Sequence, residues 1–417
     1  DVCSSDLDGY IRGEGVVTLL LKPMIKAIQD GDFIHGVIKG TAVNHNGRSL
    51  TLMSSHPDRQ SDPIQLALKE SNLKPESIDY FETHGAGSMV GDCLEIEALS
   101  RVYNQNSGLC LGFNKPSIGH TEAVSGLISL VKVLLSMNKQ EIPASLVSQP
   151  LHPSVQSSLE NFKWSMIGDN RRWPEHNTIA QAAVHAFGIG GTNVHTVLET
   201  YENEVKEVDS TDLNQYIFVF SSKTIESLFN QLKAYRRYFD SSAFEKQKQL
   251  RGEQQVLIDI MYTLLAGRDH FKYRVAVVAD SEAGIKEHVK TLCEKLEQAF
   301  LDTSLSADTP RKVKRIFHRL PKCFYHMMAD YDESFNLDAN SDMDQSFITS
   351  LWEDRNLERL AYFYTIGASL NWQEMMQPFS VSRLPLPTYQ FESSPCFPDL
   401  KTMDDNQLLT HENISTM

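Results

Sequence analysis

The sequence lacks any hydrophobic run long enough to cross a membrane. Its longest apolar stretches, Val16–Leu21 and Leu127–Leu135, fall well short of the roughly 20 residues that a spanning helix needs. The chain also does not open with a basic segment followed by an apolar one, which is the pattern of a secretory signal. These absences predict a soluble protein of the cytoplasm without a membrane partner.

Paired cysteines are missing as well. The cysteines lie far apart and form no C-x-x-C pair, which argues against a zinc site and offers no disulfide framework for a chain of this size. We therefore expect reduced thiols and no bound metal. The six cysteines are Cys3, Cys93, Cys110, Cys293, Cys323 and Cys396.

Positive charge is scarce. The 39 Lys and Arg residues are outnumbered by 54 Asp and Glu residues, which gives a formal net charge of −15. We recognise no cluster of Lys and Arg on one face, and a nucleic-acid partner needs such a cluster for counterion release. The composition therefore predicts that this chain binds no nucleic acid. With 41% hydrophobic and 22% charged residues, its 417 residues suit two or three globular domains.

Strand-like and helix-like segments alternate from Gly13 to about Glu199, which is typical of a layered α/β structure. Gly15–Leu21 is a continuous apolar run and predicts a strand that is buried on both faces. Asp92 is expected to cap the helix that it begins. Further strands are expected at residues 37–43, 78–82, 109–113, 180–187 and 194–199, and helices at 24–30, 64–71, 92–103 and 121–138.

A second α/β unit is expected in the other half of the chain. Its clearest strands are residues 216–222 and 274–279, with helices near 225–239 and 285–300. The tail from Leu357 to Pro398 contains a proline-rich string and predicts an extended strap. The expected divisions are residues 1–7, 8–200, a polar linker at 201–215, a linker domain with its strap at 216–398, and a tail at 399–417.

Three loops that follow predicted strands carry unusual polar and glycine-rich strings, and catalytic groups are usually placed on such loops. Residues 82–88 read E-T-H-G-A-G-S, so glycine follows His84 directly. Residues 114–121 read N-K-P-S-I-G-H-T and place His120 before a helix, whose dipole disfavours an imidazolium ion. Residues 187–193 read F-G-I-G-G-T-N and predict a glycine turn between two strands.

Each of these strings also has a plainer interpretation. A single histidine at a strand end is often a structural residue, and the Gly190-Gly191 string fits a tight hairpin better than a nucleotide-binding loop. Two histidines that each adjoin a glycine and follow separate strands favour one shared pocket. We interpret the remaining candidates, His45, His185 and His195, as structural.

In this order the strings resemble the C-terminal part of the β-ketoacyl synthases, specifically the ketosynthase domains of modular polyketide synthases. The family motif E-x-H-G-T-G-T-x-x-G-D corresponds to Glu82–Asp92, and K-S-N-I-G-H-x-E corresponds to Lys115–Glu122. The other motifs are D-G-Y-x-R-G-E-G at Asp8–Gly15, V-N-H-N-G-R at Val43–Arg48 and F-G-x-G-G-T-N-x-H at Phe187–His195. Motifs in this order over residues 8–195 are highly specific.

The resemblance implies an α/β fold, namely the C-terminal half of a thiolase-like fold followed by a small α/β linker domain. It also implies a transferase that performs a decarboxylative Claisen condensation. In that reaction an acyl chain on an active-site cysteine reacts with malonyl carried on the phosphopantetheine arm of an acyl carrier protein. His84 and His120 would donate hydrogen bonds to the enolate oxygen, each worth on the order of 3 kcal/mol, and Lys115 would order the pocket.

Further consequences come from the same resemblance. The substrate-binding residues it implies are Thr121, Phe187, Gly188, Ile189 and Gly190. The expected partners are the carrier protein, acyl and malonyl thioesters and a second copy of the intact synthase. No cofactor or metal is expected on this chain itself, since the phosphopantetheine belongs to the carrier protein.

The sequence departs from the family pattern at several positions. Ala86 and Ser88 replace two threonines, and Pro116 and Ser117 replace a Ser-Asn pair. Ile189 stands where phenylalanine is usual, which implies a change in chain selectivity. Neither histidine is lost, so the motifs favour an enzyme over the alternative, a non-catalytic ketosynthase-like scaffold that docks carrier proteins.

Cys3 resembles the family's nucleophile string D-x-A-C-S-S but stands only five residues before Asp8. In the family a much longer stretch, with a helix and several strands, separates the two. Residues 1–7 also match the translated end of a common sequencing adapter, so we expect a library artefact there. The nucleophile is then expected to be absent and the chain to be inactive alone, with exposed apolar surface.

The second half of the sequence resembles the linker domain that follows ketosynthases. The matching strings are Tyr262–Arg268 and Arg274–Val278, and Leu384–Phe391 resembles a strap that follows an acyltransferase domain in many synthases. No G-x-S-x-G nucleophile elbow occurs in the sequence. The resemblance therefore implies a synthase whose acyltransferase acts in trans, although this half also fits a simple packing surface.

Overall fold

The computed structural model describes residues 10–48, 56–146, 150–174, 179–203, 213–301, 309–327, 342–368 and 370–392. Its contacts divide the chain into two compact units, Asp1–Glu204 and Val205–Met417. The expected artefact at residues 1–7 and the tail at 399–417 lie outside the described residues, as do the first two positions of the motif at Asp8–Gly15.

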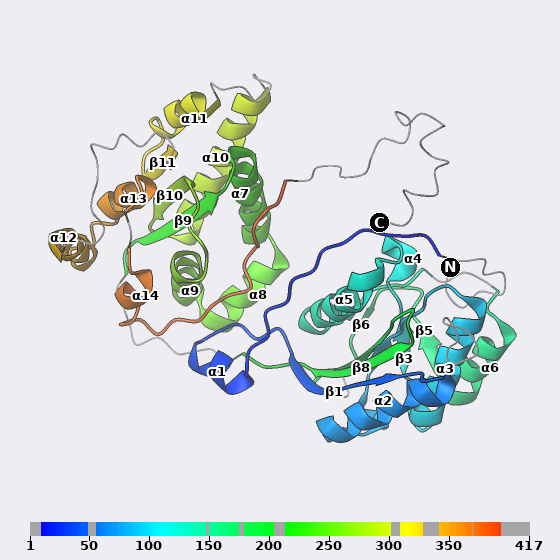
Figure 1. Ribbon diagram of the computed structural model, residues 1–417. Helices are drawn as coiled ribbons and strands as arrows, with labels where there is room; N and C mark the ends of the chain where they lie inside the picture. Colours follow the sequence, from blue (N-terminus) through cyan, green and yellow to red (C-terminus); the bar gives the residue numbers. More distant parts are fainter. Residues whose placement is uncertain are drawn as a thin grey trace. The chain divides into compact units, whose positions relative to one another are not determined.

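A six-stranded mixed sheet organises the first unit (Figure 1). The strands β1, β8 and β7 are antiparallel neighbours, whereas β2, β3 and β5 run parallel to β7. The order across the sheet is β1 (Val37–His45), β8 (Thr192–Glu199), β7 (Gln181–Phe187), β2 (Tyr80–Glu82), β3 (Cys110–Gly112) and β5 (Ser165–Met166). The neighbouring parallel strands β2 and β3 therefore end at the same edge of the sheet.

Helices cover both faces of this sheet because successive side chains of a strand point to opposite sides. Phe81 packs in a core cluster with residues of α2 (Pro57–Ser71), α3 (Met89–Tyr103) and α6 (Pro153–Phe162). Its neighbour Tyr80 packs instead with residues of α5 (Ser125–Lys139). Figure 1 shows α5 and α2 on opposite sides of the strands. The layering confirms the α/β prediction.

Short elements complete the first unit. They are α1 (Met24–Gln29), the 3-10 helices η1 (Pro75–Ser77) and η2 (Glu122–Val124), α4 (Lys115–Ile118), and the strand pair β4 (Glu141–Ile142) and β6 (Arg171–Arg172).

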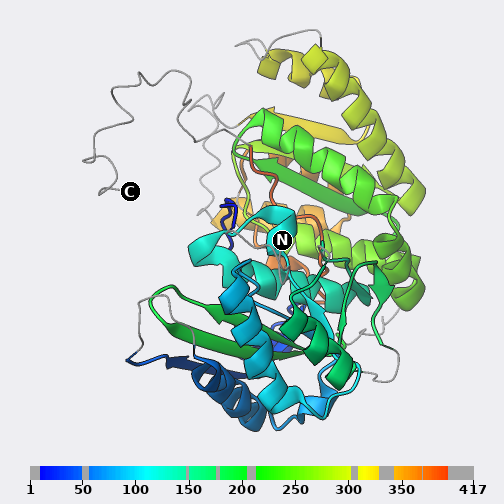
Figure 2. The ribbon, with the colours of Figure 1, turned by 90° about the vertical axis from the view of Figure 1, so that its right-hand side faces the viewer.

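The second unit has a three-stranded antiparallel sheet in the order β11 (Cys323–Met327), β10 (Tyr273–Ala279) and β9 (Tyr216–Ser222). One large apolar core joins this sheet to its helices. Figures 1 and 2 show α7 running alongside the strands. The helices are α7 (Ile225–Phe239), α8 (Ser242–Arg251), α9 (Glu253–Ala266), α10 (Glu282–Leu301), α11 (Thr309–Phe317), α12 (Asp342–Glu353), α13 (Leu357–Thr365) and α14 (Trp372–Met375).

The tail forms an extended strap only in its last part. Residues 357–376 are mainly helical in α13 and α14, where Leu360 and Trp372 are buried, so an entirely extended tail was a wrong prediction. Residues 380–392 have no regular secondary structure, and side chains of α9 bind their backbone. The backbone N–H of Leu384 donates to Thr263 Oγ1 at 2.9 Å, and that of Ser382 donates to Asp259 Oδ1 at 2.8 Å.

Two local predictions in the first unit are wrong. No strand forms at Gly15–Leu21, and Val16 and Leu20 are 96% and 93% exposed, because no described strand pairs with this segment. The cap of α3 is Ser88 rather than Asp92, since the helix begins earlier and the Ser88 hydroxyl accepts a hydrogen bond from the Gly91 N–H.

A further correction concerns charge. Lys314, Arg315, Arg319 and Lys322 gather on α11 and the turn that follows it, so Lys and Arg are clustered after all.

Two absences hold for the described ranges. None of their helices combines the length and apolar character that crossing a membrane requires. No three His, Cys, Asp or Glu side chains within those ranges are arranged to hold a metal ion.

Candidate active site

His84 lies just beyond the end of β2 and is only 8% exposed. The chain turns sharply there because Gly85 and Gly87 have φ angles of 47° and 77°, which side chains disfavour. The buried carboxylate of Glu95 on α3 accepts the N–H groups of His84 and Gly85 at 2.7 Å and 2.9 Å. These contacts fix the backbone of the loop that carries His84.

His120 lies in the loop between α4 and η2, after the neighbouring strand β3. Gly119 has a φ angle of 76°, and the His120 backbone pairs with the segment that contains the first motif. The His120 N–H donates to the Ile11 carbonyl at 2.8 Å, and the Gly13 N–H donates to the His120 carbonyl at 3.0 Å. A side chain at Gly13 would collide with the Ile118 carbonyl, which explains the glycine.

The structure brings the two histidines together. Their ring centroids are 5.5 Å apart, with the planes at 77° to each other. The backbone N–H of Phe187 donates to His84 Nδ1 at 3.3 Å, and that of Glu122 donates to His120 Nδ1 at 3.0 Å. A neutral imidazole whose Nδ1 accepts must carry its proton on Nε2. Each ring therefore presents one Nε2–H donor.

Both imidazoles are held in the neutral form. Burial lowers the pKa of His84 well below its ordinary value, and the nearby Lys115 ammonium acts in the same direction. Burial also lowers the pKa of His120, with Lys115 adding to the effect and Glu122 opposing it. Two neutral donors at neutral pH follow from this environment.

Lys115 begins α4 and is buried, with its ammonium group donating to the His84 carbonyl oxygen. Burial lowers the pKa of Lys115, while the carboxylates of Glu95 and Glu82 act against that effect. Lys115 thus holds the backbone of one histidine and supplies positive charge close to both.

Only some of the predicted substrate-binding residues lie next to the histidine pair. The Phe187 ring lies 5.1 Å from the His84 ring, and Thr121 is buried directly after His120. Gly188, Ile189 and Gly190 instead form the tip of the hairpin between β7 and β8, where Ile189 is 69% exposed. The contacts described for this tip run to Thr192 and His45 rather than to either catalytic candidate.

Sequence reasoning missed Glu95. It is 3% exposed, binds the His84 loop, and lies 3.6 Å from His185 Nδ1. Burial raises the pKa of this carboxyl group, whereas the two backbone N–H groups that it accepts lower it. Its place on α3, three residues after Asp92, gives no sequence signal that its carboxylate binds the loop before the helix.

A second missed contact supports β2 itself. Glu82 is completely buried, and Lys132 on α5 donates to its Oε2 at 2.7 Å. The Tyr80 hydroxyl donates to the same oxygen at 2.5 Å. The contact between Lys132 and Glu82 joins α5 to β2, the strand that precedes His84.

The described cysteines contact other parts of the chain. Cys93 lies 3.3 Å from His152 Nδ1, and Cys110 lies next to Arg171. Cys293 and Cys323 are buried in the second unit. Among the described residues, the arrangement therefore offers two hydrogen-bond donors and a nearby cation, which suits the stabilisation of a developing oxyanion.

Family models match most of the chain. Residues 35–149 match the β-ketoacyl synthase C-terminal domain, and residues 153–256 match the ketoacyl-synthetase C-terminal extension. Residues 219–295 match the RhiE-like KS-MAT linker domain. The first of these matches contains both histidines, and the last lies in the second unit.

Curated relatives include polyketide synthases of Bacillus subtilis. Polyketide synthase PksR is 28% identical over 98% of this chain and 16% of its own length. Polyketide synthase PksL is 32% identical over 92% of this chain and 8% of its own length. The chain thus spans a small part of the curated relatives that it matches.

Solved ketosynthases share the fold. The ketosynthase from module 6 of the bacillaene synthase of Bacillus subtilis 168 superposes with a TM-score of 0.69 at 24% identity, covering 89% of this chain and 59% of that one. The module 1 ketosynthase of the Bacillus amyloliquefaciens bacillaene synthase gives 0.70 at 23% identity, covering 94% and 63%. The fold is therefore thiolase-like.

Proposed function

Since the chain belongs to the polyketide synthase ketosynthases, as a C-terminal segment with its extension and linker domain, we propose that it serves decarboxylative condensation. The observation that carries the proposal is the pair of neutral imidazoles at His84 and His120 with their Nε2–H groups free to donate. Such a pair suits a reaction that builds negative charge on one oxygen without adding full charges to the site.

The proposed chemistry begins with malonyl thioester. The bond between its carboxylate carbon and its α-carbon breaks, carbon dioxide leaves, and the electron pair moves onto the thioester carbonyl as an enolate. The Nε2–H groups of His84 and His120 donate to that enolate oxygen. The α-carbon then attacks an acyl thioester, forms the new carbon–carbon bond and expels the thiolate.

Condensation also requires a cysteine to carry the acyl chain. None of the described cysteines has a contact with the histidine pair, so we propose that the thiol comes from outside the described residues. The proposal includes an acyl carrier protein that delivers malonyl on phosphopantetheine and an acyltransferase that acts in trans. It also includes a dimeric synthase located in the cytoplasm.

The scaffold alternative rests on the altered residues Ala86 and Pro116. Pro116 occupies the first turn of α4, a position where proline fits well, and the glycines beside Ala86 keep their positive φ angles. The Glu95 and Lys115 contacts to the His84 loop are present. These observations favour an enzyme over a scaffold.

The test is carbon dioxide release from malonyl-carrier protein by the complete synthase module that contains this chain. His84→Ala and His120→Ala should each slow release by about 10²-fold or more, because each removes one oxyanion donor. His56→Ala, a matched change at an exposed histidine, should have no effect. Carrier-protein binding without carbon dioxide release from the unmodified module would instead support the scaffold.

A further inference from the structure

Residues 10–13 contact the loop that carries His120. We propose that Arg12 and Glu122 are positioning residues, whose ion pair holds the backbone N–H of Glu122 against His120 Nδ1. Both act through the imidazole of His120 rather than on the substrate. The inference rests on the proposed function, in which His120 donates a hydrogen bond from Nε2.

Glu122 has a left-handed backbone. Its φ angle is 51°, a conformation that residues with a side chain disfavour. Both of its backbone groups are bound, since the N–H donates to His120 Nδ1 at 3.0 Å and the carbonyl accepts from the Ser125 N–H. Because Ser125 fixes the chain on one side of Glu122, a return to negative φ must turn the peptide that carries the N–H away from the ring. The contact that sets the His120 tautomer therefore depends on what stabilises this strained residue.

Arg12 provides that stabilisation. Its Nε lies 2.8 Å from Glu122 Oε1, and the Tyr10 hydroxyl lies 3.5 Å from the same oxygen. The backbone of Arg12 is itself fixed to His120 by a parallel bridge with a hydrogen bond on each side. The ion pair therefore holds Glu122 in place relative to the histidine that its N–H contacts.

The same segment acts on the imidazole in two further ways. The Tyr10 ring packs on the His120 ring with the centroids 4.8 Å apart. Burial lowers the pKa of His120, and the Glu122 carboxylate opposes that effect. The Arg12 guanidinium beside this carboxylate offsets part of its charge, which favours the neutral imidazole.

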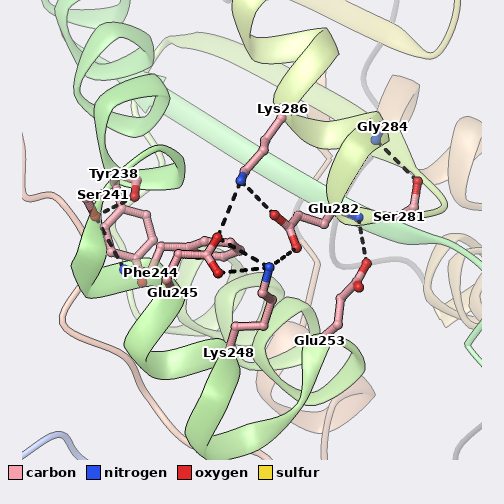
Figure 3. A network of polar contacts seen from close by, with 10 residues as sticks. All are labelled: Tyr238, Ser241, Phe244, Glu245, Lys248, Glu253, Ser281, Glu282, Gly284 and Lys286. Carbon is pink, nitrogen blue, oxygen red and sulfur yellow. Dashed lines mark hydrogen bonds and ion pairs between the residues drawn. The ribbon is translucent and has the colours of Figure 1, made fainter.

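The expected effect is on the loop rather than on the stability of the fold. The side chains of Arg12 and Glu122 are 79% and 47% exposed, and ion pairs this exposed contribute little to stability. A small contribution is sufficient here, because it only has to offset the strain of one left-handed residue. Figure 3 shows an ion pair that serves as a matched control, between Lys286 and Glu282 of α10 at 2.6 Å.

The test is a double-mutant cycle on carbon dioxide release by the complete module. Arg12→Ala and Glu122→Ala should each slow release about fivefold, because each leaves the left-handed backbone without its ion pair. Glu122→Gly should restore most of the rate lost in Glu122→Ala, since glycine adopts a positive φ without strain. Arg12→Ala added to Glu122→Gly should then have no further effect. Lys286→Ala should leave the rate unchanged.

A second measurement reports on His120 directly in the full chain. Nitrogen NMR of the histidine-labelled protein shows whether Nδ1 accepts a hydrogen bond and Nε2 carries the proton, with the signal assigned from His120→Gln. The signal should change in Arg12→Ala and Glu122→Ala and return in Glu122→Gly. A residue that only stabilises the fold would not move it.

Failure of this inference and failure of the proposed function give different results. Carbon dioxide release at the normal rate from His120→Ala would refute the proposed function. Loss of release in His120→Ala, together with an Arg12→Ala effect that is equal with Glu122 and with Gly at that position, would overturn the positioning role alone. An unchanged His120 signal in both Ala variants would also overturn it.

Discussion

At the scale of single residues, the core of the first unit contains two buried imidazoles. His185 and His195 are completely buried with ring centroids 4.9 Å apart, and each packs against Phe81. The charged group facing His185 is Glu95, at 3.6 Å, and the polar group facing His195 is the Tyr103 hydroxyl, at 3.4 Å. Burial lowers the pKa of His185 to about 3 and that of His195 well below its ordinary value.

This environment predicts a loss of stability in mild acid. In the unfolded chain each histidine takes up a proton near pH 6.5, whereas the folded chain keeps both rings neutral until much lower pH. Stability is therefore complete above about pH 6.5 and should fall below it by about 1.4 kcal/mol per pH unit for each histidine. Hydrogen exchange of β7 and β8 amides at about pH 7.5 and 5.5 measures the loss.

His185→Phe provides the control for that measurement. It removes one titrating ring while filling the same apolar site. The loss of unfolding free energy between the two pH values should therefore be smaller by the amount that one histidine contributes. A fall of unchanged steepness in this variant would contradict the assignment to buried imidazole.

The histidine pair was predictable because β2 and β3 are parallel neighbours, so loops at their carboxyl ends must meet. The role of Glu95 was not predictable, because a carboxylate in a helix gives no sign that it turns inward toward backbone N–H groups. The tautomers of His84 and His120 also needed coordinates, since they depend on N–H groups of Phe187 and Glu122 that approach from other segments.

At the scale of secondary-structure elements, α9 and the strap depend on one buried ion pair. Arg251 and Asp259 are 2.8 Å apart, with side chains 3% and 0% exposed. Burial raises the pKa of Asp259, and the Ser382 N–H and the Arg251 guanidinium oppose that rise. The pair joins the end of α8 to the start of the strap.

Asp259→Asn should therefore destabilise the second unit by about 3 kcal/mol, because it leaves a buried guanidinium uncompensated. Glu297→Gln breaks an exposed pair with Lys233 and should cost less than about 1 kcal/mol. Urea unfolding, with hydrogen exchange of α9 amides, compares the two. Equal costs would contradict the role given to the buried pair.

Periodicity predicted α7 without error in its bounds and placed most strands within two residues. It missed α13 and α14 because nearby prolines suggested an extended tail, although Leu360 and Trp372, one on each helix, are buried. It also misjudged Gly15–Leu21, since an apolar run indicates burial only where a partner strand exists.

At the scale of the whole molecule, the apolar residues among 16–25 form an exposed hydrophobic surface. Val16, Leu20, Leu21 and Ile25 are between 71% and 96% exposed, which is unusual for a soluble surface. We expect another part of the complete synthase to cover it. Function is therefore tested in the complete module, where the histidine loops have all their neighbours.

The most direct test of the account compares side chains that can and cannot donate a hydrogen bond at the two histidine positions. His84→Gln and His120→Gln place an amide N–H near the original Nε2, whereas His84→Leu and His120→Leu do not. Carbon dioxide release from malonyl-carrier protein should fall by about 10²-fold or more in the Leu variants and by clearly less in the Gln variants. Equal rates for Gln and Leu, or full activity in either Leu variant, would contradict the proposed donor pair.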